Sequence, residues 1–179
     1  MRTANTLRDR FEPTHSFVLG PVRLAAWLAR RRVPLVPTLL QILTRVVFGA
    51  DLPAGIRWPR QLVLLHNGLG MAIHADCRFE GPIVIAPAAM LGHRLVEPDG
   101  PPTFGPGVLV GNGAAVLGPV RVGRLCAIGA KALVIDDVPD FHIASGVPAT
   151  VRPMRPDQVR SLAALMGLDA PDLPEDPDA

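Results

Sequence analysis

Aromatic side chains and clustered positive charge are both scarce in this sequence. Its 179 residues include no tyrosine, only 4% aromatic residues and a single lysine, and the formal net charge is +2. Proteins that bind nucleic acid normally present a clustered basic face, and those that hold single strands stack bases on aromatic rings. The composition therefore argues against a nucleic-acid partner.

Cysteine is also rare, and long apolar runs are missing. Cys77 and Cys126 fall where the repeat described below places small inward side chains, so we expect buried free thiols. The most apolar segment, within 33–49, is too short to span a bilayer and is bracketed by arginines. We expect it to pack on the rest of the chain or on a neighbouring subunit, with membrane contact as the open alternative. Since no signal-peptide pattern opens the sequence, we expect a cytoplasmic protein without stable membrane insertion.

The strongest pattern that is present is a period of six. Six consecutive blocks begin with a bulky apolar residue, at Phe104, Val110, Val116, Val122, Ile128 and Val134. A small or aliphatic residue stands four positions later in each block, at Val108, Ala114, Val120, Cys126, Ala132 and Val138. Helices repeat every three or four residues and simple strands every two, whereas a period of six indicates the coils of a hexapeptide β-helix. The low aromatic content suits its narrow interior.

The chain divides into segments of different character. We expect a mainly β fold in three parts: an N-terminal helical cap over 1–50, a left-handed parallel β-helix over 51–153, and a C-terminal helix with an acidic disordered tail over 154–179. The cap should contain two helices, the second starting near Pro37. The C-terminal helix should start at Pro156 and end at Gly167. A proline-rich interruption of the period predicts an extended loop over 93–103.

Two stretches of the sequence resemble a known family. The coils that end in IDDVPDFHIASGVPA resemble those of hexapeptide acyltransferases, and the upstream segment DLPAGIRWPRQLVLLHNGLGMAIHADC resembles the active-site segment of serine acetyltransferases. The resemblance covers about residues 20–153 and is greatest to short members with an H-N-G-L-G turn. It implies an acetyl-CoA-dependent O-acetyltransferase acting on L-serine or a related small acceptor, with no metal. It also implies a homotrimer with active sites between subunits.

The same resemblance assigns a catalytic pair. His66 matches the histidine that takes the proton from the acceptor hydroxyl, and Asp51, 15 positions earlier, matches the aspartate that holds it. The chemistry is reasonable, because an alcohol attacks a thioester poorly until its proton is removed and histidine is a base of suitable strength near neutral pH. Leu65 stands where typical members have a further aspartate.

The resemblance also indicates a binding surface for CoA. Gly111, Asn112, Ala130 and Lys131 match coil positions that line the pantetheine arm in the family. Lys131 is the candidate for a phosphate contact, although a solvated surface charge is the alternative. Asp136 replaces a basic residue that is common before the D-V-P turn.

The acceptor site departs from the family pattern. His93 and Arg94 open the extended loop and are the candidate acceptor-binding residues. Typical serine acetyltransferases carry an Arg-His pair that resembles a holder for the substrate carboxylate. This chain has Gly100 and Pro101 in that part of the loop. A sugar or natural-product hydroxyl is therefore an alternative acceptor.

Two other classes of function stay open. A β-helical zinc enzyme would need three well-placed ligands, for which His66, His74 and His93 are the candidates. These histidines lack the close pair that such zinc enzymes carry. A non-catalytic scaffold is the second alternative, and the presence of His66 favours catalysis over it.

Overall fold

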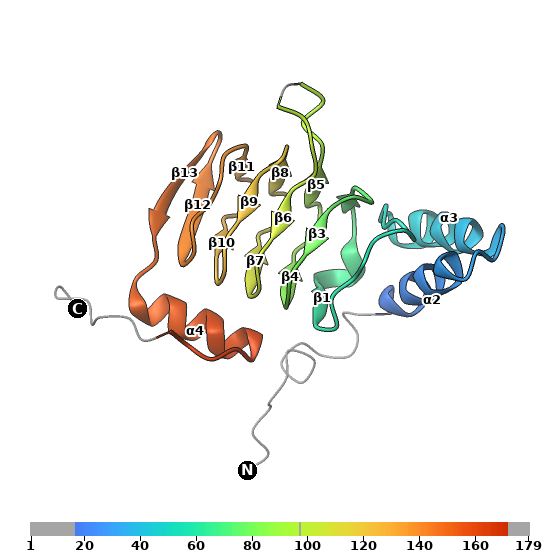
Figure 1. Cartoon of the computed structure of the whole chain (residues 1–179), viewed down its shortest axis with the longest axis horizontal. Coiled ribbons are helices and arrows are strands. Elements are labelled where there is room, and N and C mark those ends of the chain that lie inside the picture. The colour runs from blue at the N-terminus through green and yellow to red at the C-terminus, as the bar shows by residue number, and fades with distance from the viewer. Residues whose placement is uncertain (1–16, 97, 172–179) are drawn as a thin grey trace, which may run out of the picture.

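The computed structural model describes residues 17–96 and 98–171 and is built mainly from short strands (Figure 1). The strands are β1 (Leu62–Leu64), β2 (Ala72–Ile73), β3 (Arg78–Phe79), β4 (Ile83–Ile85), β5 (Met90–Gly92), β6 (Thr103–Phe104), β7 (Val108–Val110), β8 (Ala115–Leu117), β9 (Arg121–Val122), β10 (Ala127–Ile128), β11 (Leu133–Val134), β12 (His142–Gly146) and β13 (Ala149–Pro153). Residues 1–16, which begin the expected cap, and 172–179, which end the expected tail, lie outside the described residues.

Successive strands belong to three different sheets, as expected of a coil with a triangular cross-section. The sheets have the orders β1-β4-β7-β10-β12-β13, β11-β8-β5-β2 and β3-β6-β9. Every pairing is parallel except that of β13, which folds back antiparallel on β12 and ends the coil. The expected parallel β-helix is therefore confirmed.

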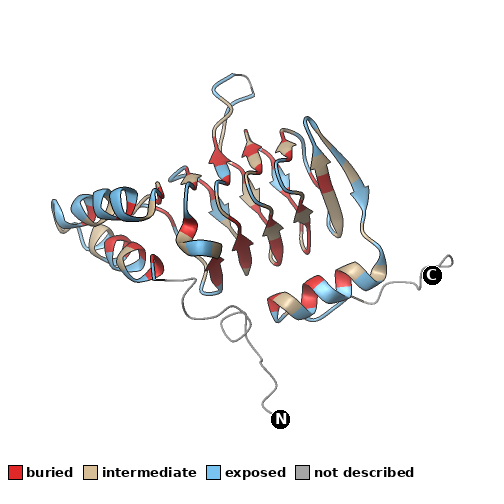
Figure 2. Cartoon of the chain, turned by 180° about the vertical axis from the view of Figure 1, so that it is seen from behind, coloured by how far each residue is buried: buried red, intermediate tan, exposed pale blue. Residues whose placement is uncertain are grey.

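The period of six sets the register. Val110 pairs with Ile128 and Val116 with Val134, so one full coil takes 18 residues, or three blocks. All twelve repeat positions named above are buried, none exposing more than 4% of its surface. Figure 2 shows buried segments, in red, along the stacked strands of the coil. The repeat positions thus form the core.

The extended loop interrupts this register once. Phe79 pairs with Phe104, 25 positions later, whereas Phe104 pairs with Val122 after the regular 18. Seven extra residues are therefore extruded between β5 and β6, and Figure 1 shows them projecting from the coil. The loop lies where the proline-rich segment predicted it.

Among the described residues, two helices precede the coil, in the region where the sequence predicted them. Helix α2 spans Leu19–Arg30, and α3 spans Val36–Phe48 with Pro37 in its first turn. Val18, Leu19 and Val22 pack into the same buried cluster as the first coil, so α2 closes that end of the core. Within 17–96 and 98–171, no helix is long and apolar enough to cross a membrane.

Helix α4 follows the coil and covers one of its faces. It spans Pro156–Met166 and ends at Gly167 in the left-handed conformation, as predicted. Its buried side chains pack on Val63 of β1 and Val84 of β4, which point outward from the first sheet. This helix leaves the other two faces of the coil uncovered within the described chain.

Candidate active site

One corner of the coil repeats the same backbone conformation in every turn. This corner joins the six-stranded sheet to the four-stranded sheet and contains Gly70, Ala88, Gly113 and Lys131, all at φ between 58° and 70°. The N–H groups of the last three each donate to a carbonyl of the coil before, at 2.8 Å. The corner is therefore a ladder of stacked left-handed turns.

The first coil has a longer version of this corner. Seven residues separate β1 from β2, whereas four separate β4 from β5 at the equivalent place. The extra length accommodates the four-residue turn η2 (Leu65–Gly68), in which His66, Asn67 and Gly68 have φ values of 50°, 56° and 72°. Left-handed backbone in non-glycine residues is uncommon and is concentrated at functional sites. His66 is exposed on this insertion.

Asp51 lies beside the same segment through its backbone. Its N–H donates to the Met71 carbonyl at 2.8 Å, and its carbonyl accepts from the Ile73 N–H at 3.1 Å. A methyl group placed on Gly68 would lie 3.7 Å from Ala50, the residue before Asp51. The fold thus brings the segments that carry His66 and Asp51 together.

The Asp51 carboxylate is also tied to helix α3. Its Oδ1 forms an ion pair with Arg45 at 2.6 Å and accepts a hydrogen bond from Gln41 at 3.4 Å. The Arg45 hydrogen bond, opposed by partial burial and helped by Gln41, holds the pKa of Asp51 below its ordinary value. Asp51 is therefore an anion near neutral pH. Its assigned role as the partner of His66 stays a prediction.

The four residues matched to CoA binding come together on the corner ladder. Gly111 and Asn112 lie directly against Ala130 and Lys131 of the next coil, with the Lys131 N–H donating to the Asn112 carbonyl at 2.8 Å. A Cβ on Gly111 would stand 2.6 Å from the Ala130 nitrogen, so glycine is required there by packing. Ala130 and Lys131 are exposed. Their binding role stays a prediction.

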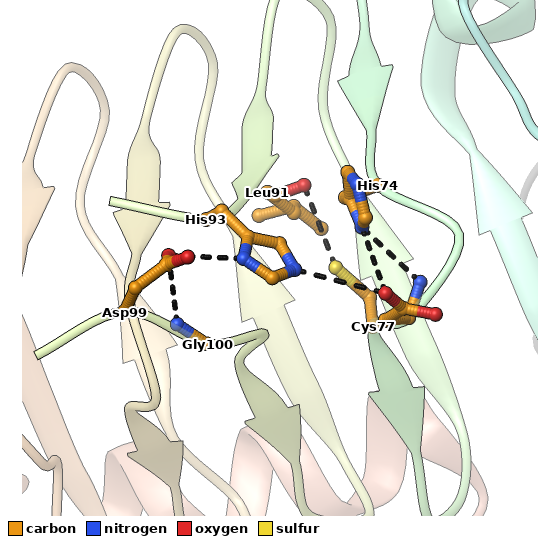
Figure 3. Close-up of polar contacts among 7 residues, drawn as sticks. His74, Cys77, Leu91, His93, Asp99 and Gly100 are labelled. Atoms are coloured by element: carbon orange, nitrogen blue, oxygen red, sulfur yellow. Dashed lines mark hydrogen bonds and ion pairs between the residues drawn. The ribbon is translucent and has the colours of Figure 1, made fainter. Parts of the chain in front are cut away.

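A second polar cluster lies at the base of the extended loop (Figure 3). His93 Nδ1 is 2.9 Å from Asp99 Oδ1, and His93 Nε2 is 3.7 Å from Asp76 Oδ2. His74 Nδ1 lies 3.6 Å from the same Asp76 oxygen, and the two imidazole rings meet edge to face at 4.3 Å. The Asp99 side chain also accepts from the Gly100 N–H at 2.8 Å. These contacts join the two ends of the loop to the coil.

The hydrogen bonds fix where His93 carries its proton. The His93 hydrogen bond lowers the pKa of Asp99, so that carboxylate is ionised and Nδ1 must donate to it. In the neutral ring, Nε2 then carries a lone pair. This nitrogen is buried and has no hydrogen-bond partner among the described residues. Its nearest charged neighbour is Asp76 Oδ2 at 3.7 Å, beyond hydrogen-bond distance.

Three side chains of this cluster also meet the geometric conditions for a metal. His74, Asp76 and His93 each offer a ligand atom, and these atoms lie within 4.8 Å of one another. The set differs from the trio considered from sequence, because Asp76 takes the place of His66. Arg94, the other predicted acceptor residue, instead runs beside Gly118.

The two clusters occupy opposite edges of one sheet. The His66 turn precedes the four-stranded sheet, whereas His74 and His93 follow its strands β2 and β5. From Ala88 on the corner ladder to His93 the extended chain covers five residues, or about 16 Å. A single copy of the chain therefore keeps the candidate base and the candidate acceptor residues apart.

Some polar residues of these sites escaped the sequence analysis. Asn67 carries a buried side-chain oxygen that has no hydrogen-bond partner within the described residues, directly after His66. The H-N-G-L-G turn is the sequence feature that could have identified Asn67. Asp76 and Asp99 had no such signal, because their partners lie on other coils.

These features define a β-helix protein of the hexapeptide-repeat class with a histidine displayed on an enlarged corner. No family model matches the sequence. Curated serine acetyltransferases do: one from Synechococcus elongatus is 32% identical over 130 residues, 72% of this chain, and one from Mycobacterium tuberculosis is 33% identical over 131 residues, again 72%. The chain spans 53% and 56% of these two relatives, a little over half of each.

Solved structures give the same result. A serine acetyltransferase from Brucella abortus superposes with a TM-score of 0.71 at 29% identity, covering 76% of this chain and 55% of that one. The same enzyme in complex with coenzyme A gives 0.70 at 29% identity, covering 75% and 54%. A Neisseria gonorrhoeae serine acetyltransferase in complex with serine gives 0.67 at 29% identity, covering 74% and 54%. The chain is a homologue of the serine acetyltransferases over most of its length, as the sequence resemblance indicated.

Proposed function

We propose that this chain is an acetyl-CoA-dependent O-acetyltransferase that uses His66 as its general base. The observation that carries the proposal is the three-residue enlargement of one coil corner, which displays His66 beside the segment of Asp51. Its acceptor is L-serine or a related small hydroxyl compound. The homologous serine acetyltransferases, one of them in complex with coenzyme A, support this reading.

The reaction transfers one acetyl group between two heteroatoms. The acceptor hydroxyl oxygen attacks the thioester carbonyl carbon while the imidazole of His66 takes the hydroxyl proton. The C–S bond then breaks, and the imidazolium returns the proton to the CoA sulfur. A positioned base of this kind contributes on the order of 10²- to 10⁴-fold to the rate.

Asp51 stabilises the imidazolium in this proposal. Arg45 and Gln41 both contact Oδ1 of Asp51, which leaves Oδ2 as the oxygen assigned to His66. A carboxylate on the far ring nitrogen selects the tautomer whose other nitrogen accepts the proton. Helix α3 therefore helps to position Asp51, which in turn stabilises the protonated His66.

CoA lies along the corner ladder in this proposal. The exposed Ala130 and Lys131 border the same corner as the His66 turn, three coils further along. Lys131 is the only lysine of the chain and supplies a positive charge for a CoA phosphate. Gly111 and Asn112 contribute mainly by keeping adjacent coils close at this corner.

The complete active site requires more than one copy of the chain. One copy holds the His66 corner and the loop cluster at opposite edges of a sheet. In a homotrimer with parallel coils, the His66 corner of one copy faces the loop edge of the next. We therefore assign His93 and Arg94 to the acceptor side of a cleft between subunits.

The loop cluster favours a second acceptor class. Two carboxylates, Asp76 and Asp99, flank His93 at the loop base, and Gly100 and Pro101 follow where typical serine acetyltransferases carry their Arg-His pair. Negative charge repels a substrate carboxylate, whereas carboxylates and imidazoles bind neutral hydroxyls well. A sugar or natural-product hydroxyl is thus the alternative acceptor.

A thiol-release assay tests the proposal. Purified protein is given acetyl-CoA with L-serine, homoserine and representative sugars, and free CoA is followed with a thiol reagent. Acceptor-dependent release with an acetylated product by mass spectrometry is expected. Release with sugars but not with serine would select the alternative acceptor. No acceptor-dependent release across the panel, from protein that binds CoA, would contradict the proposed acetyl transfer to these acceptors.

A further inference from the structure

The helical hairpin formed by α2 and α3 exposes most of the large apolar side chains on the described surface. Ten of the fifteen exposed large hydrophobic residues lie between Phe17 and Val47. In α3 only Pro37 and Thr44 are buried, so this helix is exposed on most of its circumference (Figure 2). Leu35 and Val46 expose 76% and 77% of their surfaces. Exposed apolar side chains gathered on one hairpin in this way indicate an interaction site.

The same hairpin is strongly basic. Residues 17–50 contain five arginines and no acidic residue, and since the whole chain carries +2, the rest carries −3. Three of the arginines, Arg30 to Arg32, are consecutive and join the two helices at the hairpin tip. Within the described chain, only Arg45 of the five forms an ion pair. The apolar surface is therefore bordered by uncompensated positive charge.

The arrangement at the tip resembles an interfacial anchor. Arg31 stacks over the ring of Trp27 at 4.2 Å, and Trp27 itself is 45% exposed. The strongly exposed Leu35 follows within four residues of this pair. Tryptophan and arginine next to exposed aliphatic residues suit the boundary between headgroups and acyl chains. Figure 1 places the hairpin at the β1 end of the coil, away from the body of the sheets.

We propose that the α2–α3 hairpin docks the protein onto the surface of an anionic lipid bilayer. Its apolar side chains enter the boundary region, and Arg30 to Arg32 contact anionic headgroups. The positive charge of the hairpin argues for this occupant over direct pairing of two hairpins, which would bring together ten arginines without an acidic residue between them. The docking is peripheral, since neither helix is long enough to cross a membrane.

Vesicle sedimentation tests the proposal with the full chain. The protein is mixed with vesicles of phosphatidylcholine alone or with 30% phosphatidylglycerol, at low and high salt. We expect at least tenfold tighter binding to the anionic vesicles, weakened by high salt. Since each arginine near an anionic surface contributes about fivefold in affinity, replacing Arg30 to Arg32 by glutamine should weaken binding on the order of 100-fold.

Matched variants separate the hairpin from the rest of the surface. Leu39→Glu with Val46→Glu should abolish vesicle binding, whereas Val147→Glu, at another exposed apolar residue, should not. Neutralising three exposed arginines elsewhere, Arg57, Arg60 and Arg160, should also leave binding unchanged. Circular dichroism and a thermal melt confirm that each variant is folded.

The fluorescence of Trp27 gives an independent readout. A blue shift is expected on adding anionic vesicles, and Trp27→Phe should remove the shift while sedimentation persists. Equal binding to both vesicle types, no binding, or equal weakening by the control variants would overturn the proposal. The proposal would also be overturned if the wild type did not bind vesicles and Leu39→Glu lowered the mass of the assembly in light scattering. The apolar face would then be a contact between copies of the chain.

Discussion

Asp51 contacts two parts of the molecule at once, with its backbone on the first coil and its carboxylate on helix α3. If the carboxylate supports His66, Asp51→Asn should keep the fold and lower kcat on the order of 10²-fold or more, because an amide no longer stabilises the imidazolium. Steady-state kinetics with a thermal melt measures both effects. A variant with unchanged kcat would limit Asp51 to the helix contact.

Arg45→Gln is the matched control, because it removes the helix contact and keeps the carboxylate. It should lower kcat less than Asp51→Asn does, because the carboxylate stays while its contact with helix α3 is weakened, and it should also change the acid stability. The pKa of Asp51 is lowered mainly by the Arg45 hydrogen bond, so the pair stabilises the fold above the ordinary carboxyl pKa of 3.8 and this contribution is lost as the pH falls below that value. The stability of the variant should therefore depend less on pH below 3.8 than that of the wild type. Thermal melts across this pH range measure the difference.

The two cysteines lead to a prediction for alkaline conditions. Burial raises the pKa of Cys77 from 9.0 to about 12 and that of Cys126 to about 11. Both thiols should resist a thiol reagent at pH 8 in the native protein and react in denaturant. Because the raised pKa values favour the neutral thiols, stability should decline as the pH rises above 9. Rapid labelling of the native protein at pH 8 would contradict the burial.

At the scale of single residues, the sequence identified those that break a pattern. His66 interrupts the period of six and lies in a recognisable turn, so the sequence predicted its place on an irregular part of the coil, and its role as a base stays a proposal. The partners of His93 were not predicted from the sequence. Asp76 approaches it from another coil, and Asp99 from the far end of the loop. Contacts across coils depend on register and loop path, which residue spacing does not specify.

At the scale of elements, the corner ladder limits what each coil tolerates. A side chain on Gly111 would meet the backbone of the next coil at 2.6 Å, and backbone cannot give way as a flexible side chain does. Gly111→Ala should cost about 1–3 kcal/mol of folding free energy and lower the melting temperature by roughly 3–10 °C. Gly55→Ala, where nothing lies within 4 Å, is the matched control. Equal melting temperatures would contradict the close approach of the coils.

The elements themselves were predictable to different degrees. The coil followed from its period, and α4 from Pro156 at its start and Gly167 at its end. The α2–α3 pair was predicted as a cap, but its outward apolar surface was not, because a sequence pattern does not say which sides of a helix meet a partner. Only the structure shows that α3 buries so little.

At the scale of the whole molecule, the loop cluster raises the question of a metal. The proposed proton transfer by His66 needs none, although His74, Asp76 and His93 are suitably placed for one. Dialysis against EDTA should therefore leave the turnover rate unchanged. Loss of activity in EDTA with recovery on adding zinc would instead support the zinc-enzyme alternative.

The central claim is that His66 is the base of an acetyl transfer from acetyl-CoA. The most direct measurement compares thiol release by the wild type and His66→Ala with the best acceptor of the panel. We predict a loss of at least 10²-fold, with CoA binding by calorimetry and the mass of the assembly unchanged. Near-normal release by His66→Ala would contradict the account and require a different base.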